Sequence, residues 1–192
     1  MKLLQRCTVL VLLCASMGCA SHQRGPVGPP PSDPIANVEA SELRAQGLGF
    51  ARRGDLVRAQ QYLSASMAKG FDERVVVPEL VKVCIASSRL RAALAFAEPY
   101  VARNPQDAGM QYVVGTIHMA LGNLEEASGH LDGALRSRSL MQDALFSLAL
   151  VAKARGQFSM ARDTLEKYLA HNPKGRYASR AKSLLARLGA DS

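Results

Sequence analysis

Apolar and small residues recur with the spacing of amphipathic helices from about residue 38 to residue 188. Positions three and four residues apart share one face of a helix, and polar residues fill the opposite face. Short polar turns, several with Gly, separate the periodic runs. The spacing predicts helices over residues 38–53, 56–69, 77–87, 90–103, 106–121, 124–138, 141–155, 158–171 and 176–188.

Two prolines fall within these predicted helices. Pro78 suits the first turn of a shortened helix, where the missing N–H group has no partner to lose. Pro99 lies inside a longer run, where we expect the proline to kink the helix.

The same pattern returns every 34 residues. Four segments align without gaps: RGDLVRAQQYL from Arg53, SSRLRAALAFA from Ser87, LGNLEEASGHL from Leu121 and RGQFSMARDTL from Arg155. Each contains an Ala at one position: Ala59, Ala93, Ala127 and Ala161. A small residue there lets two helices approach closely, and the turn before it ends the first helix. Each unit is therefore predicted to be a helix–turn–helix hairpin that buries its apolar face only by stacking on its neighbours.

This repeat resembles the tetratricopeptide repeat (TPR) family, which has a 34-residue period and a Gly-Ala-aromatic-Pro pattern. Matching residues are Gly47, Gly115, Pro105 and Pro173, with departures at Val81, Ala149, Phe71 and Ser139. The family's early Trp is absent. The resemblance implies an all-α solenoid within residues 36–175, with repeats at about 40–73, 74–107, 108–141 and 142–175, then a capping helix and tail at 176–192.

The resemblance also implies a concave surface that binds a partner peptide. Family geometry places columns 2, 5, 9 and 12 of each repeat on this surface, counting from residue 40 as column 1. The predicted partner-binding residues are Arg44, Lys82, Tyr112, Met119, Phe146, Leu150 and Lys153. Tyr112 and Phe146 share a column, so we expect two aromatic anchors on one surface, with Lys82 and Lys153 steering an acidic partner. Alternatively, part of this set packs against the next repeat. The carboxylate clamp of chaperone-binding TPR domains is not matched, because Leu48 stands where that clamp needs Asn.

The first 18 residues have the pattern of an export signal, with Lys2 and Arg6 ahead of a short apolar run. That run is too short to span a bilayer. Gly18-Cys19 resembles the bacterial lipobox, although Ser16 departs from its usual Leu, so we predict that Cys19 is lipidated. The alternative is plain cleavage after Ala20. Because Ala20 is not Asp, the resemblance implies an outer-membrane lipoprotein that faces the periplasm, and the alternative implies a soluble periplasmic protein.

Residues 19–35 are predicted to be a spacer behind the lipid. The segment SHQRGPVGPPPSDP at residues 21–34 contains five prolines, which forbid a helix and favour polyproline II. Fourteen such residues reach about 43 Å at roughly 3.1 Å each.

Composition agrees with helices, and charge leaves the partner open. The chain of 192 residues is 48% hydrophobic and only 5% aromatic, with no Trp. Strand cores depend more on aromatic and β-branched residues. A net charge of +8 permits nucleic acid, anionic lipid or an acidic protein as the partner. Export, few aromatics and the lack of a basic motif argue against nucleic acid.

Candidate chemistry is sparse. The sequence has no phosphate-binding loop and no Gly-x-Ser-x-Gly elbow, and His118, His130 and His171 lack metal-ligand spacing. We interpret His118 and Cys84 as buried structural residues, and Arg53-Gly54-Asp55 as a repeat turn. We therefore expect no enzyme activity, no cofactor and no metal.

Lipobox and repeats together favour a membrane-anchored, non-catalytic protein–protein interaction scaffold in envelope assembly. The combination resembles the pilotin lipoproteins of type IV pilus assembly, and a motility or secretion adaptor fits equally well. The alternative is a soluble periplasmic accessory factor of a cell-wall enzyme.

Overall fold

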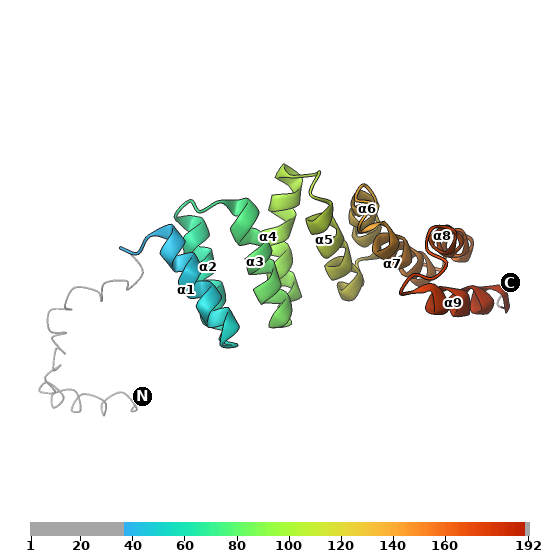
Figure 1. The fold of residues 1–192 in the computed structure, drawn as a ribbon, viewed down its shortest axis with the longest axis horizontal. Coiled ribbons are helices and arrows are strands. Elements are labelled where there is room, and N and C mark those ends of the chain that lie inside the picture. Colours follow the sequence, from blue (N-terminus) through green and yellow to red (C-terminus); the bar gives the residue numbers. More distant parts are fainter. Residues whose placement is uncertain (1–36, 191–192) are drawn as a thin grey trace, which may run out of the picture. The chain divides into compact units, whose positions relative to one another are not determined.

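The computed structural model describes residues 37–190, and every regular element within that range is an α-helix (Figure 1). The helices are α1 (Ala40–Arg52), α2 (Leu56–Ala68), α3 (Glu73–Ala86), α4 (Leu90–Arg103), α5 (Ala108–Leu121), α6 (Leu124–Ala134), α7 (Met141–Ala154), α8 (Phe158–His171) and α9 (Ala178–Ala190). The predicted all-α solenoid is confirmed. The signal segment, Cys19 and the Pro-rich spacer lie outside the described residues.

Consecutive helices form four antiparallel hairpins, each stacked on the next. Helices α1 and α2 make the first hairpin and α7 and α8 the fourth, and α9 then packs against α8 (Figure 1). The Ala positions read from the sequence, Ala59, Ala93, Ala127 and Ala161, are all completely buried. Four apolar clusters between successive helices form the core, so the array has no single central core.

Local chemistry fixes where the helices begin and end. The side chain of Asp55 accepts a hydrogen bond from the Arg58 N–H at 3.0 Å, and Asp107 accepts one from the Met110 N–H at 2.9 Å. Gly122 has φ +80°, the left-handed conformation that closes a helix without steric cost to Gly. Ser88 holds the same turn column at φ 58°, so repeat 2 makes this turn without Gly.

Helix α3 corrects one prediction. It begins at Glu73, four residues before the predicted start, so Pro78 lies inside the helix and not in its first turn. The Asp72 side chain accepts a hydrogen bond from the Arg74 N–H at 2.9 Å and caps this earlier start. Three apolar residues that α3 then buries, Val76, Val77 and Leu80, offset the one backbone hydrogen bond that Pro78 removes. Helix α4 continues through Pro99 to Arg103.

Candidate partner-binding surface

The odd-numbered helices are neighbours along one side of the array. An ion pair joins α1 to α3, with Arg44 Nε 2.9 Å from Glu79 Oε2. A second joins α7 to the residues before α9, between Asp143 and Arg176. Between them, α5 meets α7 in one apolar cluster that includes Tyr112. The predicted partner-binding residues therefore lie on adjacent elements, as the repeat columns require.

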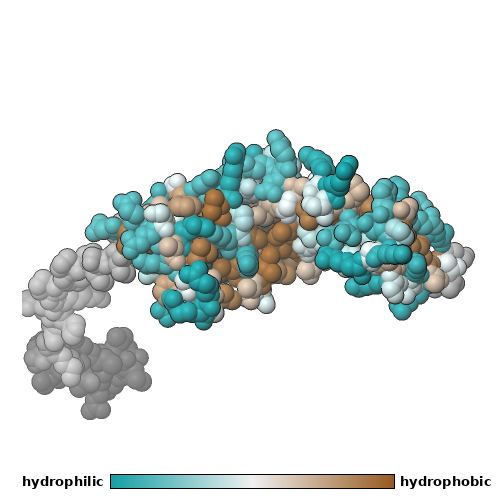
Figure 2. All heavy atoms as spheres, in the orientation of Figure 1, coloured by the Kyte–Doolittle hydropathy of each residue, from teal (hydrophilic) through white to brown (hydrophobic). Residues whose placement is uncertain are grey.

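Helix α3 has the most open apolar stripe of the predicted surface. Val75 and Ile85 keep 38% and 40% of their surface exposed, and Lys82 is exposed between them. These three residues and Pro78 fall on one face of the helix by its 100° per residue. Figure 2 shows hydrophobic surface gathered over the middle of the array, between more hydrophilic flanks.

The remaining predicted residues differ in how open they are. Tyr112 and Met119 of α5 are half-buried against the apolar cluster with α7, and Leu150 is half-buried in the next cluster. Lys153 is exposed at the end of α7. The Glu79 carboxylate binds Arg44 with two hydrogen bonds and raises the pKa of its guanidinium, so Arg44 is already neutralised within the array.

Phe146 corrects the expectation of two aromatic anchors on an open face. It is only 3% exposed and belongs to the core. Its ring stacks on that of Tyr177, with centroids 4.3 Å apart and planes at 6°, and lies 5.9 Å from the ring of Tyr168. Arg180 of α9 adds a cation–π contact at 5.5 Å. The residues at and just before the capping helix therefore cover this end of the predicted surface.

Tyr177 and Arg180 are surface residues that the sequence analysis did not include. They stand 34 residues after Asp143 and Phe146, so they continue columns 2 and 5 into the half-repeat at 176–190. Extending the columns past residue 175 would have found them. Burial, and then the nearby Asp143 carboxylate, raise the pKa of the Tyr177 phenol, and the Arg176 guanidinium lies 4.6 Å from its ring.

The buried polar groups make interior contacts. His118 is 4% exposed, with Nε2 3.1 Å from Glu98 Oε1, and its ring stacks on His130 with centroids 5.5 Å apart. Cys84 is fully buried with Sγ 3.7 Å from Gln60 Oε1, and burial raises the pKa of its thiol. Within residues 37–190, no group of His, Cys, Asp and Glu is placed to hold a metal ion.

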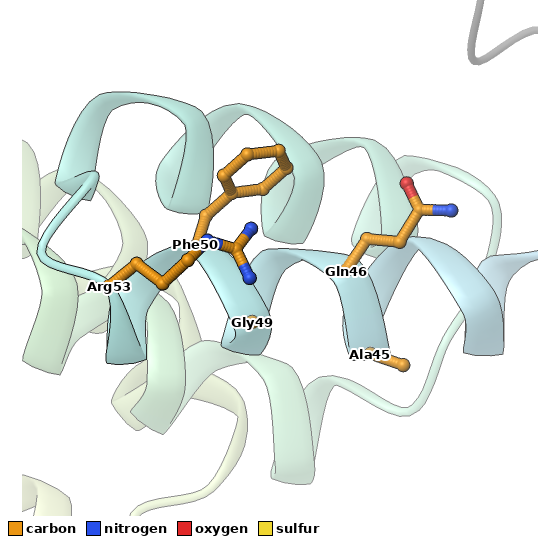
Figure 3. A pocket seen from close by; sticks show the side chains of 5 residues that line it. All are labelled: Ala45, Gln46, Gly49, Phe50 and Arg53. Carbon is orange, nitrogen blue, oxygen red and sulfur yellow. The ribbon is translucent and has the colours of Figure 1, made fainter.

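Two shallow hollows lie away from the predicted surface. One, of about 470 Å³, is on α1 beside Phe50 and Arg53 (Figure 3). The other, of about 380 Å³, lies beside Tyr100 and Asp107, and burial with the hydrogen bond to Asp107 raises the pKa of Tyr100 to about 12. None of the helices described is both long enough and apolar enough to cross a bilayer.

Comparison with known proteins agrees with this geometry. The sequence profile described as tetratricopeptide repeat matches residues 85–144 and 115–176. The repeat array belongs to the tetratricopeptide repeat family. Its TPR columns are those read from the sequence, and their alignment extends to the first repeat, which the profile does not reach.

Solved TPR structures share the fold. A TPR protein from Parabacteroides merdae superposes with a TM-score of 0.71 and 20% identity over 79% of this chain, which spans 60% of that protein's length. YrrB, described as a TPR protein with an unusual peptide-binding site, gives 0.66 and 17% identity over 75% of this chain and 74% of its own. MamA gives 0.67 and 18% over 74% and 81%. Comparison with curated protein sequences gives no match.

Proposed function

We propose that this TPR array is a non-catalytic scaffold that binds a segment of a partner protein along its odd-numbered helices. The open stripe on α3 is the observation that carries the proposal. Val75 and Ile85 are large aliphatic side chains exposed on an internal helix, where stacking on both sides has already buried Val76, Leu80 and Val83. Exposed aliphatic side chains that no repeat covers are typical of a binding surface.

The chemistry of this surface favours a partner segment with apolar and acidic residues. Half-buried Tyr112 and Met119 continue the apolar stripe onto α5, where an amphipathic helix or an extended peptide can pack. Lys82 and Lys153 are exposed on the same series of helices and attract carboxylates. The peptide-binding site named for YrrB supports a peptide ligand for this array.

A paired substitution tests the surface. In Val75→Ser/Ile85→Ser, partners captured by crosslinked pull-down should be lost, and a purified partner should bind at least about tenfold more weakly, because apolar anchors dominate interface energies. Val57→Ser is the matched control: Val57 is 70% exposed, but it lies on α2, an even-numbered helix. Equal binding by the double variant and the control, both folded by circular dichroism, would rule out this surface.

We also propose that the scaffold is anchored to the outer membrane through a lipid on Cys19 and faces the periplasm. The Gly18-Cys19 pair after a short apolar run supports this proposal. A fatty-acid probe should label the wild-type chain and leave Cys19→Ser unlabelled, whereas label on that variant would contradict lipidation. A soluble periplasmic protein is the other outcome, shown by an unlabelled wild-type chain in the periplasmic fraction.

An anchored scaffold suits envelope assembly, as a pilotin-like factor or a motility or secretion adaptor. The Pro-rich stretch between Cys19 and Asn37 is long enough to separate the repeats from a bilayer, since it would reach roughly 50 Å if extended. Deleting the gene and scoring secretin assembly, motility and secretion separately distinguishes these roles. Normal function in all three would contradict the proposal.

A further inference from the structure

The outer face of α1 differs from the same face of the later repeats. In repeats 2 to 4, columns 3, 7 and 10 hold apolar residues that face the preceding hairpin: Val76, Leu80 and Val83; Met110, Val114 and Ile117; Ala144, Leu148 and Val151. All but Leu148 are buried. In repeat 1 the same columns hold Glu42, Gln46 and Gly49. A further TPR hairpin has no apolar surface to stack on here.

Column 11 nevertheless keeps a large aromatic residue in repeat 1. In the later repeats this column holds Cys84, His118 and Ala152, all at most 4% exposed. Cys84 and His118 contact the second helix of the preceding repeat, through Gln60 and Glu98 respectively. In repeat 1 the residue is Phe50, which has no preceding repeat and is only half-buried. An aromatic ring therefore stands where the other repeats are covered.

A hollow lies beside this ring. Ala45, Gln46, Gly49, Phe50 and Arg53 line it, and Gly49 leaves it open by having no side chain (Figure 3). The Phe50 ring also packs on Tyr62, with centroids 5.0 Å apart. The guanidinium carbons of Arg53 and Arg58 each lie 4.8 Å from the centre of the Phe50 ring. The hollow thus combines an aromatic wall with two positive charges.

We propose that the Pro-rich segment at residues 26–34 of this chain docks in the hollow as a polyproline II helix. Proline-rich segments bind aromatic-lined grooves because their conformation is set before binding and little entropy is lost. Asp33 gives the segment a carboxylate that complements Arg53 and Arg58. The polar residues at columns 3, 7 and 10 disfavour a second copy stacked as a further repeat, and the Pro-rich segment is tethered beside the site.

The chain connection permits this docking. The start of α1 is held in place, because Ser66 Oγ donates to the Ala40 carbonyl at 2.6 Å and Lys69 Nζ to the Val38 carbonyl at 2.8 Å. From that point, Phe50 lies less than about 20 Å along the helix at 1.5 Å per residue. Residues 26–36 reach about 34 Å at roughly 3.1 Å each. Docking shortens the spacer behind Cys19, so its release lengthens the reach of the scaffold.

Trypsin cleavage after Arg24 tests the proposal, because docking of the adjacent segment restricts the extended chain that the protease needs. The probe is the chain from residue 19 with Cys19→Ser, so that no lipid contributes. Gly49→Leu fills the hollow, and cleavage should become about five- to tenfold faster as the open population rises. Gly129→Leu is the matched control, since Gly129 lies within α6 with open space around it. It should cleave at the wild-type rate.

Two further variants make the result specific to this contact. Pro29→Ser/Pro30→Ser/Pro31→Ser should cleave as fast as Gly49→Leu, and combining the two changes should add nothing further. Arg53→Glu repels Asp33 and should also speed cleavage, which keeps the test valid if Gly49→Leu fails to fold by circular dichroism. Equal rates in wild type and folded Gly49→Leu or Arg53→Glu would overturn the proposal. Protection that rises with protein concentration would overturn it in favour of a second copy.

Discussion

Gly115 and Leu131 face each other across the α5–α6 hairpin so closely that a Cβ atom on Gly115 would lie 2.8 Å from Leu131 Cγ. Gly47 stands in the same relation to Leu63, at 2.9 Å. In repeat 2, the corresponding residues are Val81 and Ala97, which share one buried cluster. The larger residue has moved to the first helix and the smaller to the second. The apparent departure at Val81 therefore conserves volume at this crossing.

Gly115→Ala should destabilise the array. The added methyl group must displace Leu131, which costs about 1–3 kcal/mol, although better helix propensity returns up to about 1 kcal/mol. Urea unfolding followed by circular dichroism measures the change. Gly129→Ala is the control, because a Cβ at Gly129 meets nothing within 4 Å, and that variant should be as stable as wild type or more stable. A stabilised Gly115→Ala would contradict the close approach.

Ala127→Leu should overpack the crossing of α5 and α6. Ala127 is completely buried, and three extra carbons cost about 1–3 kcal/mol in a filled core. The midpoint of thermal unfolding should fall, whereas Ala170→Leu on the exposed face of α8 should leave it nearly unchanged. An unchanged midpoint in Ala127→Leu would mean that the repeat register is wrong.

Phe146→Ala should act on stability before it acts on binding. Removing a ring that is 3% exposed and stacked on Tyr177 leaves a cavity and costs about 3–5 kcal/mol. Tyr112→Ala, at a half-buried position of the same column, should cost less stability. Denaturant midpoints of the two variants make the comparison. Equal midpoints would show that α9 does not cover Phe146 in solution.

Stability should fall as the pH drops below about 6.5, the ordinary pKa of His. Burial, and then the neighbouring His118, lower the pKa of His130 in the folded protein, against smaller opposing effects of Glu98 and Glu126. The unfolded chain therefore takes up a proton first, and this loss continues until the pH passes the lowered pKa of folded His130. The hydrogen bond between His130 Nδ1 and Gln111 Oε1, 2.7 Å long, joins α6 to α5 at this point.

Urea unfolding at several pH values between 7.5 and 5.5 measures this dependence. His130→Asn should flatten the slope, and His171→Asn should keep it, because His171 is exposed. Comparing slopes between variants removes the contribution of other groups, including Asp132, whose carboxyl pKa burial raises. The same slope in wild type and His130→Asn would exclude His130 as the cause.

The sequence alone determined the helices, the hairpins and the 34-residue register, because each depends on the spacing of residues close together in the chain. Ala59 and its three repeats were placed correctly at buried crossings for this reason. Tertiary structure decided which surfaces stay open. The sequence indicated a capping helix, but not that the residues around it would bury Phe146, since column position gives a direction and not a cover. Likewise, the hollow beside Phe50 exists because no repeat precedes α1, and a side chain is buried only where another element is present to cover it.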